Sequence, residues 1–267
     1  MSEATTLEWI RRVGLLPYVK LLKRLLVKLH LRPQTGSRYV HRNQAYRLLS
    51  GRGLEVGALH CPANLPKNCA VEYCDAHSKA DSAKLFPEIE HGLLVEVDYL
   101  VNLDEDRLAD KVKPSYDFVI MNHVIEHVAN PLSVLEQLFT VIRPGGYVLV
   151  SAPDKRYTFD KPRQLTTFHH LYDEYQKGIT VVDDEHYLDF IRHTAPEIFN
   201  SGDAERLAAT LASVRNRREH AHVWDSESFL DFVTEAIRVL GLNAAVEFVS
   251  RADSNNIECF VMLRSTD

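Results

Sequence analysis

Two apolar segments separated by a helical pattern constrain the fold of this chain most strongly. Phe118 to Met121 is a short uncharged apolar run, typical of a strand buried on both faces of a parallel sheet. Pro131 to Ile142 carries apolar residues at the helical period, and Pro144 with the two glycines after it ends that helix. Tyr147 to Val150 resumes an apolar strand. This order of strand, helix and strand requires a right-handed crossover.

Further strands are expected on both sides of this unit. Gly53 to Ala58 is an apolar strand that ends in a glycine turn, where an α/β sheet brings its backbone close to a ligand. The other expected strands are Ala70 to Asp75, a region within Leu93 to Leu103, Ala245 to Val249 and Ile257 to Leu263, the last two joined by a turn at Asp253 to Asn256. The pattern predicts an α/β fold.

The chain of 267 residues divides into four segments by composition. Residues 154–225 are rich in His, Asp, Glu, Tyr and Arg, contain helical patterns around Phe168 to Gln176 and Ala204 to Arg217, and are interpreted as an insertion that covers the substrate pocket. The expected segments are a basic N-terminal part at 1–50, a ligand-binding α/β half at 51–153, the insertion at 154–225, and a closing helix and hairpin at 226–267. A further helix is expected at Ser82 to Glu90.

Charge is concentrated at the N-terminus. Residues 1–52 hold eleven Lys or Arg against Glu3 and Glu8, a formal +9, which leaves −15 on the remainder to give the total of −6. Between Pro17 and Pro33, leucines and lysines fall on separate arcs of a helix. Such a helix either lies on an anionic membrane surface or packs against the body or a second subunit, and packing is slightly favoured.

Several classes of protein are disfavoured by the same composition. Lysines interrupt any apolar core of a secretory signal, and no apolar run is long enough to span a membrane. Nucleic-acid binding is not expected because the remainder is acidic. The four cysteines lack CxxC spacing, so reduced thiols in a cytoplasmic compartment are expected.

Asp75 ends the second expected strand a little under twenty residues after Gly57. An acid at this position typically accepts hydrogen bonds from the hydroxyls of a ribose. The dense glycine loop of dinucleotide-binding proteins is absent, so a nicotinamide dehydrogenase is disfavoured. A ligand with a ribose and no pyrophosphate is indicated.

Residues Gly51 to Arg264 resemble the class I S-adenosylmethionine-dependent methyltransferases of the methyltransferase-11 or methyltransferase-23 type. The likeness is strongest over Leu54 to Ala58 and Tyr116 to Asp160. It implies a Rossmann-like, mostly parallel sheet of seven strands with a final antiparallel hairpin and a helical insertion, and S-adenosylmethionine as cofactor. Ser151 to Asp160 and His220 to Trp224 look like a subgroup found among glycan and glycolipid biosynthesis enzymes.

The resemblance also assigns residues to the donor site. Glu55, Gly57 and Ala58 would form its floor, Asp75 would bind the ribose, and Asp104 would meet the adenine amine, with Asp98 as a rival because the third strand has two registers. Asn122 and His123 would flank the methionine end. Glu126 and His127 form a pair that opens the next helix. Capping of that helix and contact with the substrate are equally favoured as the role of this pair.

A hydroxyl acceptor must lose its proton during methyl transfer, and histidine suits that role because its pKa lies near neutrality. His170 and His222 are preferred, with His127 as a third candidate. No metal site is expected, because the acids at 173, 174 and 183–185 form no compact ligand motif and favour a solvated surface. Lys155, Arg156, Tyr157 and Arg163 either hold an anionic acceptor or form salt bridges with the insertion.

The expected function is therefore O-methylation of a sugar or glycan hydroxyl, with a small molecule or glycan as the partner. Two alternatives use the same donor. One is O- or N-methylation of a secondary metabolite, and the other is a non-catalytic protein that binds S-adenosylmethionine.

Overall fold

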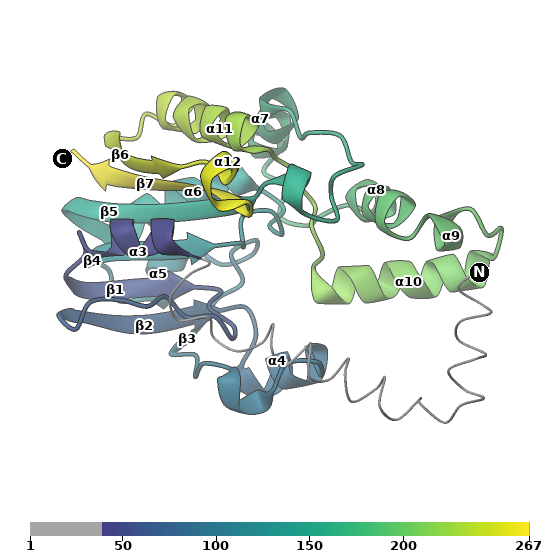
Figure 1. Ribbon diagram of the computed structural model, residues 1–267, viewed down its shortest axis with the longest axis horizontal. Coiled ribbons are helices and arrows are strands. Elements are labelled where there is room, and N and C mark those ends of the chain that lie inside the picture. Colours follow the sequence, from purple (N-terminus) through teal and green to yellow (C-terminus); the bar gives the residue numbers. More distant parts are fainter. Residues whose placement is uncertain (1–38, 267) are drawn as a thin grey trace. The chain divides into compact units, whose positions relative to one another are not determined.

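A seven-stranded sheet in the order β3-β2-β1-β4-β5-β7-β6 organises the chain in the computed structural model, which describes residues 39–266 (Figure 1). The strands are β1 Gly51–Val56, β2 Cys69–Asp75, β3 Tyr99–Leu100, β4 Tyr116–Asn122, β5 Ile142–Pro153, β6 Ala244–Ser250 and β7 Glu258–Ser265. The predicted basic helix between Pro17 and Pro33, with its membrane or subunit contact, lies outside the described residues.

The pairing of the strands confirms the expected fold class. β1 pairs in parallel with β2 and β4, β2 pairs with β3, and β4 pairs with β5. β7 runs antiparallel to both β5 and β6, so the hairpin closes one edge of the sheet. Because the carboxyl ends of the parallel strands share one edge, the loops that follow β1, β2 and β4 meet there.

The described helices are α3 Val40–Tyr46, α4 Lys79–Leu85, α5 Leu108–Lys111, α6 Pro131–Val141, α7 Phe168–Lys177, α8 Asp184–Thr194, α9 Pro196–Phe199, α10 Ala204–Arg217, α11 Ser226–Val239 and α12 Ala252–Asn255. Short 3₁₀ turns lie at His91–Leu93 and Lys155–Tyr157. Within residues 39–266, no helix combines the length and the apolar character needed to cross a membrane.

Both faces of the central strand β4 are buried, as its uncharged sequence predicts. Val119 and Met121 pack on one side in the same apolar core as α6 and α11. Phe118 and Ile120 point to the other side, where they pack with Ala45 of α3 and its neighbours. A strand that is covered on both faces by helices cannot show the alternating polar pattern of an exposed sheet.

Three local expectations differ from the structure. The third strand is only two residues long, Tyr99–Leu100: before it, Val95 N donates to Leu59 O in the loop after β1, and Asp98 N donates to Tyr73 O of β2. The helix expected at Ser82 to Glu90 covers Lys79–Leu85 instead, since Ser78 caps its start and Pro87 follows its end. The predicted hairpin turn contains the short helix α12.

The helices between β5 and α11 occupy the ligand edge of the sheet. Figure 1 shows α8, α9 and α10 beyond the carboxyl ends of the parallel strands, whereas α7 lies beside α11. The chain returns to the sheet at Trp224, which bridges Asp154 and packs its ring against Phe229 and Phe232. The histidines that precede Trp224 are thereby held at this edge.

Candidate functional site

A cavity of about 260 Å³ opens at the carboxyl ends of β1, β2 and β4. Val56 ends β1 and Gly57 follows it, Asp75 ends β2, and His123 and Val124 follow β4. The segment after α10 closes it with Arg217 to Glu219. Of the sequence-predicted site residues, Gly57, Asp75, His123 and His127 line this cavity, whereas Glu55, Ala58, Asp104, Asn122, His170 and His222 do not.

Gly57 allows the loops after β1 and β4 to approach each other. Its φ is +69°, and a Cβ at this position would lie 2.3 Å from Cγ2 of Val124. Beneath it, Glu55 is buried and its carboxylate accepts hydrogen bonds from Ala63 N at 2.9 and 3.0 Å. Burial raises the pKa of Glu55 to about 7. Glu55 therefore braces the loop that shapes the cavity floor.

Asp75 presents a carboxylate at the cavity wall. Its Oδ1 accepts a hydrogen bond from His77 N at 3.1 Å, and burial raises its pKa. A carboxylate at the end of the second parallel strand fits the two hydroxyls of a ribose, which require acceptors.

The two candidate partners of the adenine amine are used within the protein. Asp104 Oδ1 accepts from Ala129 N at 2.7 Å, and its Oδ2 lies 3.3 Å from the Arg218 guanidinium. Asp98 Oδ2 accepts from Tyr73 N at 2.8 Å. Val101 and Leu103 form the adjacent cavity wall, so either contact to adenine stays a prediction.

His123 lines the cavity in a strained backbone conformation. Its φ is 53°, in the left-handed region, and its Nε2 lies 2.7 Å from Oε2 of the buried Glu258. The side chain of Asn122 points to other partners, donating to Tyr46 Oη at 3.0 Å and accepting from Ser151 Oγ at 3.1 Å. Positive φ at a non-glycine residue concentrates at ligand-binding sites, where surrounding contacts compensate the strain.

A second group of titratable side chains adjoins the cavity at His127. Its Nδ1 donates to the carbonyl oxygen of Arg218 at 2.5 Å, so its Nε2 carries the lone pair. Nε2 lies 3.7 Å from Oε1 of Glu126, whose two buried carboxylate oxygens have no hydrogen-bond partner among residues 39–266. Burial lowers the pKa of His127 to about 3 and raises that of Glu126.

His220 completes this group. Its ring lies edge-on to that of His127 at 4.7 Å, and its Nδ1 is 2.6 Å from Oδ2 of Asp160. The backbone of the next two residues fixes the segment, because Ala221 N and His222 N both donate to Glu126 O, at 2.8 and 3.0 Å. The turn after β4 and the end of the insertion are thus joined at the cavity.

The basic residues after β5 form ion pairs and hydrogen bonds. Arg163 is 1% exposed and donates to Asp160, Asp189 and two backbone carbonyls. Arg156 pairs with Asp154 and Asp253, and Lys155 Nζ donates to the carbonyl of Arg163. Of the two readings left open by the sequence, this geometry favours salt bridging over binding of an anionic acceptor.

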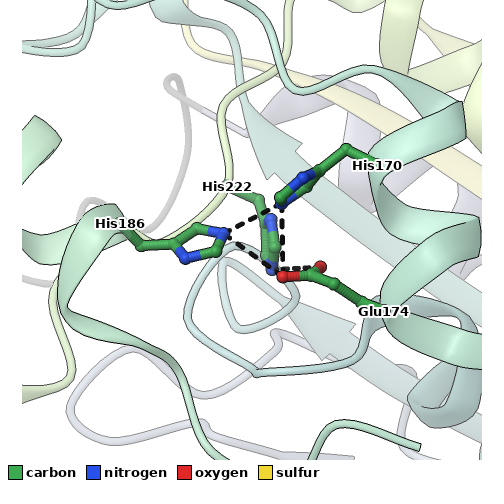
Figure 2. A group of neighbouring side chains, drawn as sticks. All are labelled: His170, Glu174, His186 and His222. Atoms are coloured by element: carbon green, nitrogen blue, oxygen red, sulfur yellow. Dashed lines mark hydrogen bonds and ion pairs between the residues drawn. The ribbon is translucent and has the colours of Figure 1, made fainter. Parts of the chain in front are cut away.

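The two preferred histidines lie together and do not line the donor cavity, although His222 Nε2 contacts the carbonyl oxygen of Val128, which does. Figure 2 shows His170 and Glu174 on α7, His186 at the start of α8, and His222 before α11, all pointing toward one another. Burial raises the pKa of Glu174 to about 7. Sequence reasoning named His170 and His222 as candidate bases and Glu174 among the solvated acids, but it did not group them with His186.

Sequence reasoning also missed Glu258 and Arg218. Glu258 is a single acid within the apolar strand that follows Ile257, and such an isolated charge is a signal for a buried ion pair. Arg218 gives no comparable signal, because it ends a charged helix and enters the cavity through a left-handed backbone turn, with φ 50°.

The strand order defines a Rossmann-like α/β protein with a cavity at the carboxyl edge of its sheet. The sequence matches the methyltransferase-23 family, a methyltransferase domain, over residues 28–236. The chain therefore belongs to this family, whose enzymes use S-adenosylmethionine.

Other similarities are partial. The chain is 39% identical over 57 residues to a ubiquinone biosynthesis O-methyltransferase of Shewanella pealeana, a stretch that covers 21% of this chain and 24% of that protein. A structure described as a Zn-dependent alcohol dehydrogenase from Rhodobacter sphaeroides aligns over 87% of this chain and 90% of that one, with 14% identity and a TM-score of 0.50. The N-methyltransferase NodS from Bradyrhizobium japonicum, solved with S-adenosylhomocysteine, aligns over 91% of this chain and 98% of that one, with 10% identity and a TM-score of 0.43.

Proposed function

We propose that this chain methylates a hydroxyl oxygen of an uncharged sugar or glycan, with His127 as the general base. The observation that carries the proposal is the position of His127, which lines the donor cavity and keeps the lone pair of Nε2 available. S-adenosylmethionine supplies an activated methyl group on a sulfonium. The protein then has to align the acceptor and accept one proton.

The residues present fit this donor. Gly57 leaves room for close approach of a ligand, and Asp75 offers acceptor oxygens for ribose hydroxyls. Val101 and Leu103 give an apolar wall suited to a purine ring. His123 and Val124 follow the central strand β4, where the methionine part is expected.

The neighbours of His127 support its role as base. Because the carbonyl of Arg218 accepts from Nδ1, the hydrogen is held on that side and Nε2 can take up the hydroxyl proton. The imidazolium that forms lies 3.7 Å from the carboxylate of Glu126, which accepts no hydrogen bond from any described residue. His220 and Asp160 position this group from the insertion side.

The acceptor class follows from the subgroup resemblance and from the basic residues. Because Arg156 and Arg163 are paired with carboxylates, an acceptor that carries a phosphate or uronate is not proposed. The same pairing favours a second candidate, O-methylation of an uncharged secondary metabolite.

The test is methyl transfer from donor labelled with ¹³C in the methyl group to a panel of neutral glycosides and a matched panel of phenols. Nuclear magnetic resonance of the product identifies the methylated oxygen. Transfer to the glycosides supports the first candidate, whereas transfer to the phenols alone supports the second. Donor binding without transfer to either panel would contradict both.

A further inference from the structure

We propose that His170, Glu174, His186 and His222 bind a divalent cation of the zinc class, which fastens α7 and α8 to the segment that leads into α11. One ligand atom from each residue lies within 4.8 Å of all the others. Four side chains from three separate parts of the chain converge on one point, as Figure 2 shows. The proposal does not depend on the identity of the methyl acceptor.

The distances agree with a four-coordinate site. His170 Nε2 lies 3.2 Å from Glu174 Oε1 and 3.1 Å from His186 Nε2, and His186 Nε2 lies 3.4 Å from Glu174 Oε1. Tetrahedral ligands at zinc–nitrogen bond lengths are separated by about 3.3 Å. His222 Nε2 lies 3.9 Å from Glu174 Oε2 and is also in contact with the Val128 carbonyl, so Nδ1 is the nitrogen of His222 that would bind a cation.

Unpaired polar atoms mark the interior of the group. Oε2 of Glu174 and Nδ1 of His222 are buried and have no hydrogen-bond partner in the part of the chain that the structure describes. His222 is 1% exposed and Glu174 is 9% exposed. Within the described part of the chain, Glu174 forms ion pairs with the three imidazoles and with no Lys or Arg. A bound cation would satisfy both atoms and balance the carboxylate.

Outer contacts already orient two of the imidazoles. His186 Nδ1 lies 2.9 Å from Asp183, the residue that also caps α8, which leaves Nε2 of His186 facing the group. His222 Nε2 lies 3.1 Å from the carbonyl oxygen of Val128, and donation there leaves the lone pair of Nδ1 free. Carboxylate and carbonyl partners of this kind are typical around metal-binding histidines.

The local sequence explains how these ligands share a face. His170 and Glu174 are four residues apart on α7, so their side chains project on the same side of the helix.

Three imidazoles with one carboxylate suit zinc and its transition-metal neighbours, whereas magnesium and calcium prefer oxygen ligands. The ligand chemistry therefore selects the class of cation.

A pair of double variants tests the site. His170→Ala with His186→Ala removes one ligand from each helix, and His169→Ala with His193→Ala removes one non-ligand histidine from each of the same helices. His169 is 85% exposed and His193 is 26% exposed in their side chains. Glu174→Gln tests the carboxylate with little change of shape.

Three measurements test the site without an activity assay. They are metal content, calorimetric titration of the chelator-treated full chain with Zn²⁺, and thermal unfolding. We expect about one zinc per chain in the unaltered protein and in the control double variant, with a higher Tm when zinc is present. The ligand double variant should lose at least about 100-fold in affinity and show no zinc-dependent rise in Tm.

Substitution of Co²⁺ adds a spectroscopic test on the unaltered chain, so the proposal can be judged even if a variant fails to fold. Intense visible absorption of tetrahedral cobalt, absent from Glu174→Gln, is the expected result. The proposal is overturned if the unaltered protein binds neither metal, or if both double variants bind zinc equally well.

Discussion

The Nε2 atom of His123 lies 2.7 Å from Oε2 of Glu258, a carboxylate with no exposed surface. His41 Nε2 lies 2.6 Å from the other oxygen, and Arg42 donates to both. Burial alone would raise the pKa of Glu258, but the charge of Arg42 and the hydrogen bonds from Arg42, His123 and His41 together outweigh it and hold the pKa well below its usual value. This carboxylate connects α3, β7 and the strained residue of the donor cavity.

Glu258→Gln should lower the free energy of unfolding by about 3–5 kcal/mol at neutral pH, because the buried Arg42 loses its partner. A depressed pKa stabilises the fold above the ordinary value of 4.5, and this contribution is lost as pH falls through the depressed pKa. The difference in unfolding free energy between Glu258→Gln and the unaltered protein should therefore shrink as the pH falls below 4.5. Urea unfolding across pH measures it, and a pH-independent difference would contradict the charge argument.

Asp75→Ala should weaken binding of S-adenosylmethionine and S-adenosylhomocysteine by roughly 10- to 100-fold, because the ribose hydroxyls lose a charged acceptor. Asp231→Ala, at an exposed position of α11, is the control. Calorimetric titration gives both affinities. Unchanged affinity in Asp75→Ala would mean that the ribose does not lie at the end of β2.

Gly57→Ala should reduce donor affinity and cost about 1–2 kcal/mol of stability for the left-handed φ alone. The close contact with Val124 should add to this cost, so Gly57→Ala combined with Val124→Ala should regain part of it. Gly178→Ala is the control, since Gly178 has φ +62° and nothing within 4 Å of its Cβ position. If Gly57→Ala and Gly178→Ala had equal unfolding free energies, the contact between the new Cβ at position 57 and Val124 would not contribute to the loss of stability.

His127→Ala should lower kcat by about 10²- to 10⁴-fold while calorimetry still detects donor binding. Because burial lowers the pKa of His127 from 6.5 to about 3, its imidazole stays neutral as pH falls through 6.5. Turnover should therefore show no acid limb near 6.5. His169→Ala, at an exposed position, is the control. An unchanged kcat in His127→Ala would show that His127 is not the general base.

Much of the fold could be predicted because each buried strand carries its own signal. The uncharged run at Phe118 to Met121 and the helix from Pro131 identify the central crossover without reference to any distant residue. Short elements were harder to place. β3 has two residues and depends on pairing with Asp75 and Cys74 rather than on any pattern of its own.

The amino-acid sequence by itself determined the α/β class, the central crossover and the position of Asp75 at a strand end, because hydrophobic period and strand ends are local properties, whereas the seven-stranded arrangement was implied by the family resemblance. Only the tertiary structure decided which histidines meet. His170, His186 and His222 are separated by many residues, and their approach depends on where α7, α8 and Trp224 dock. A cluster built across such distances has no local pattern, since its geometry arises from packing between elements.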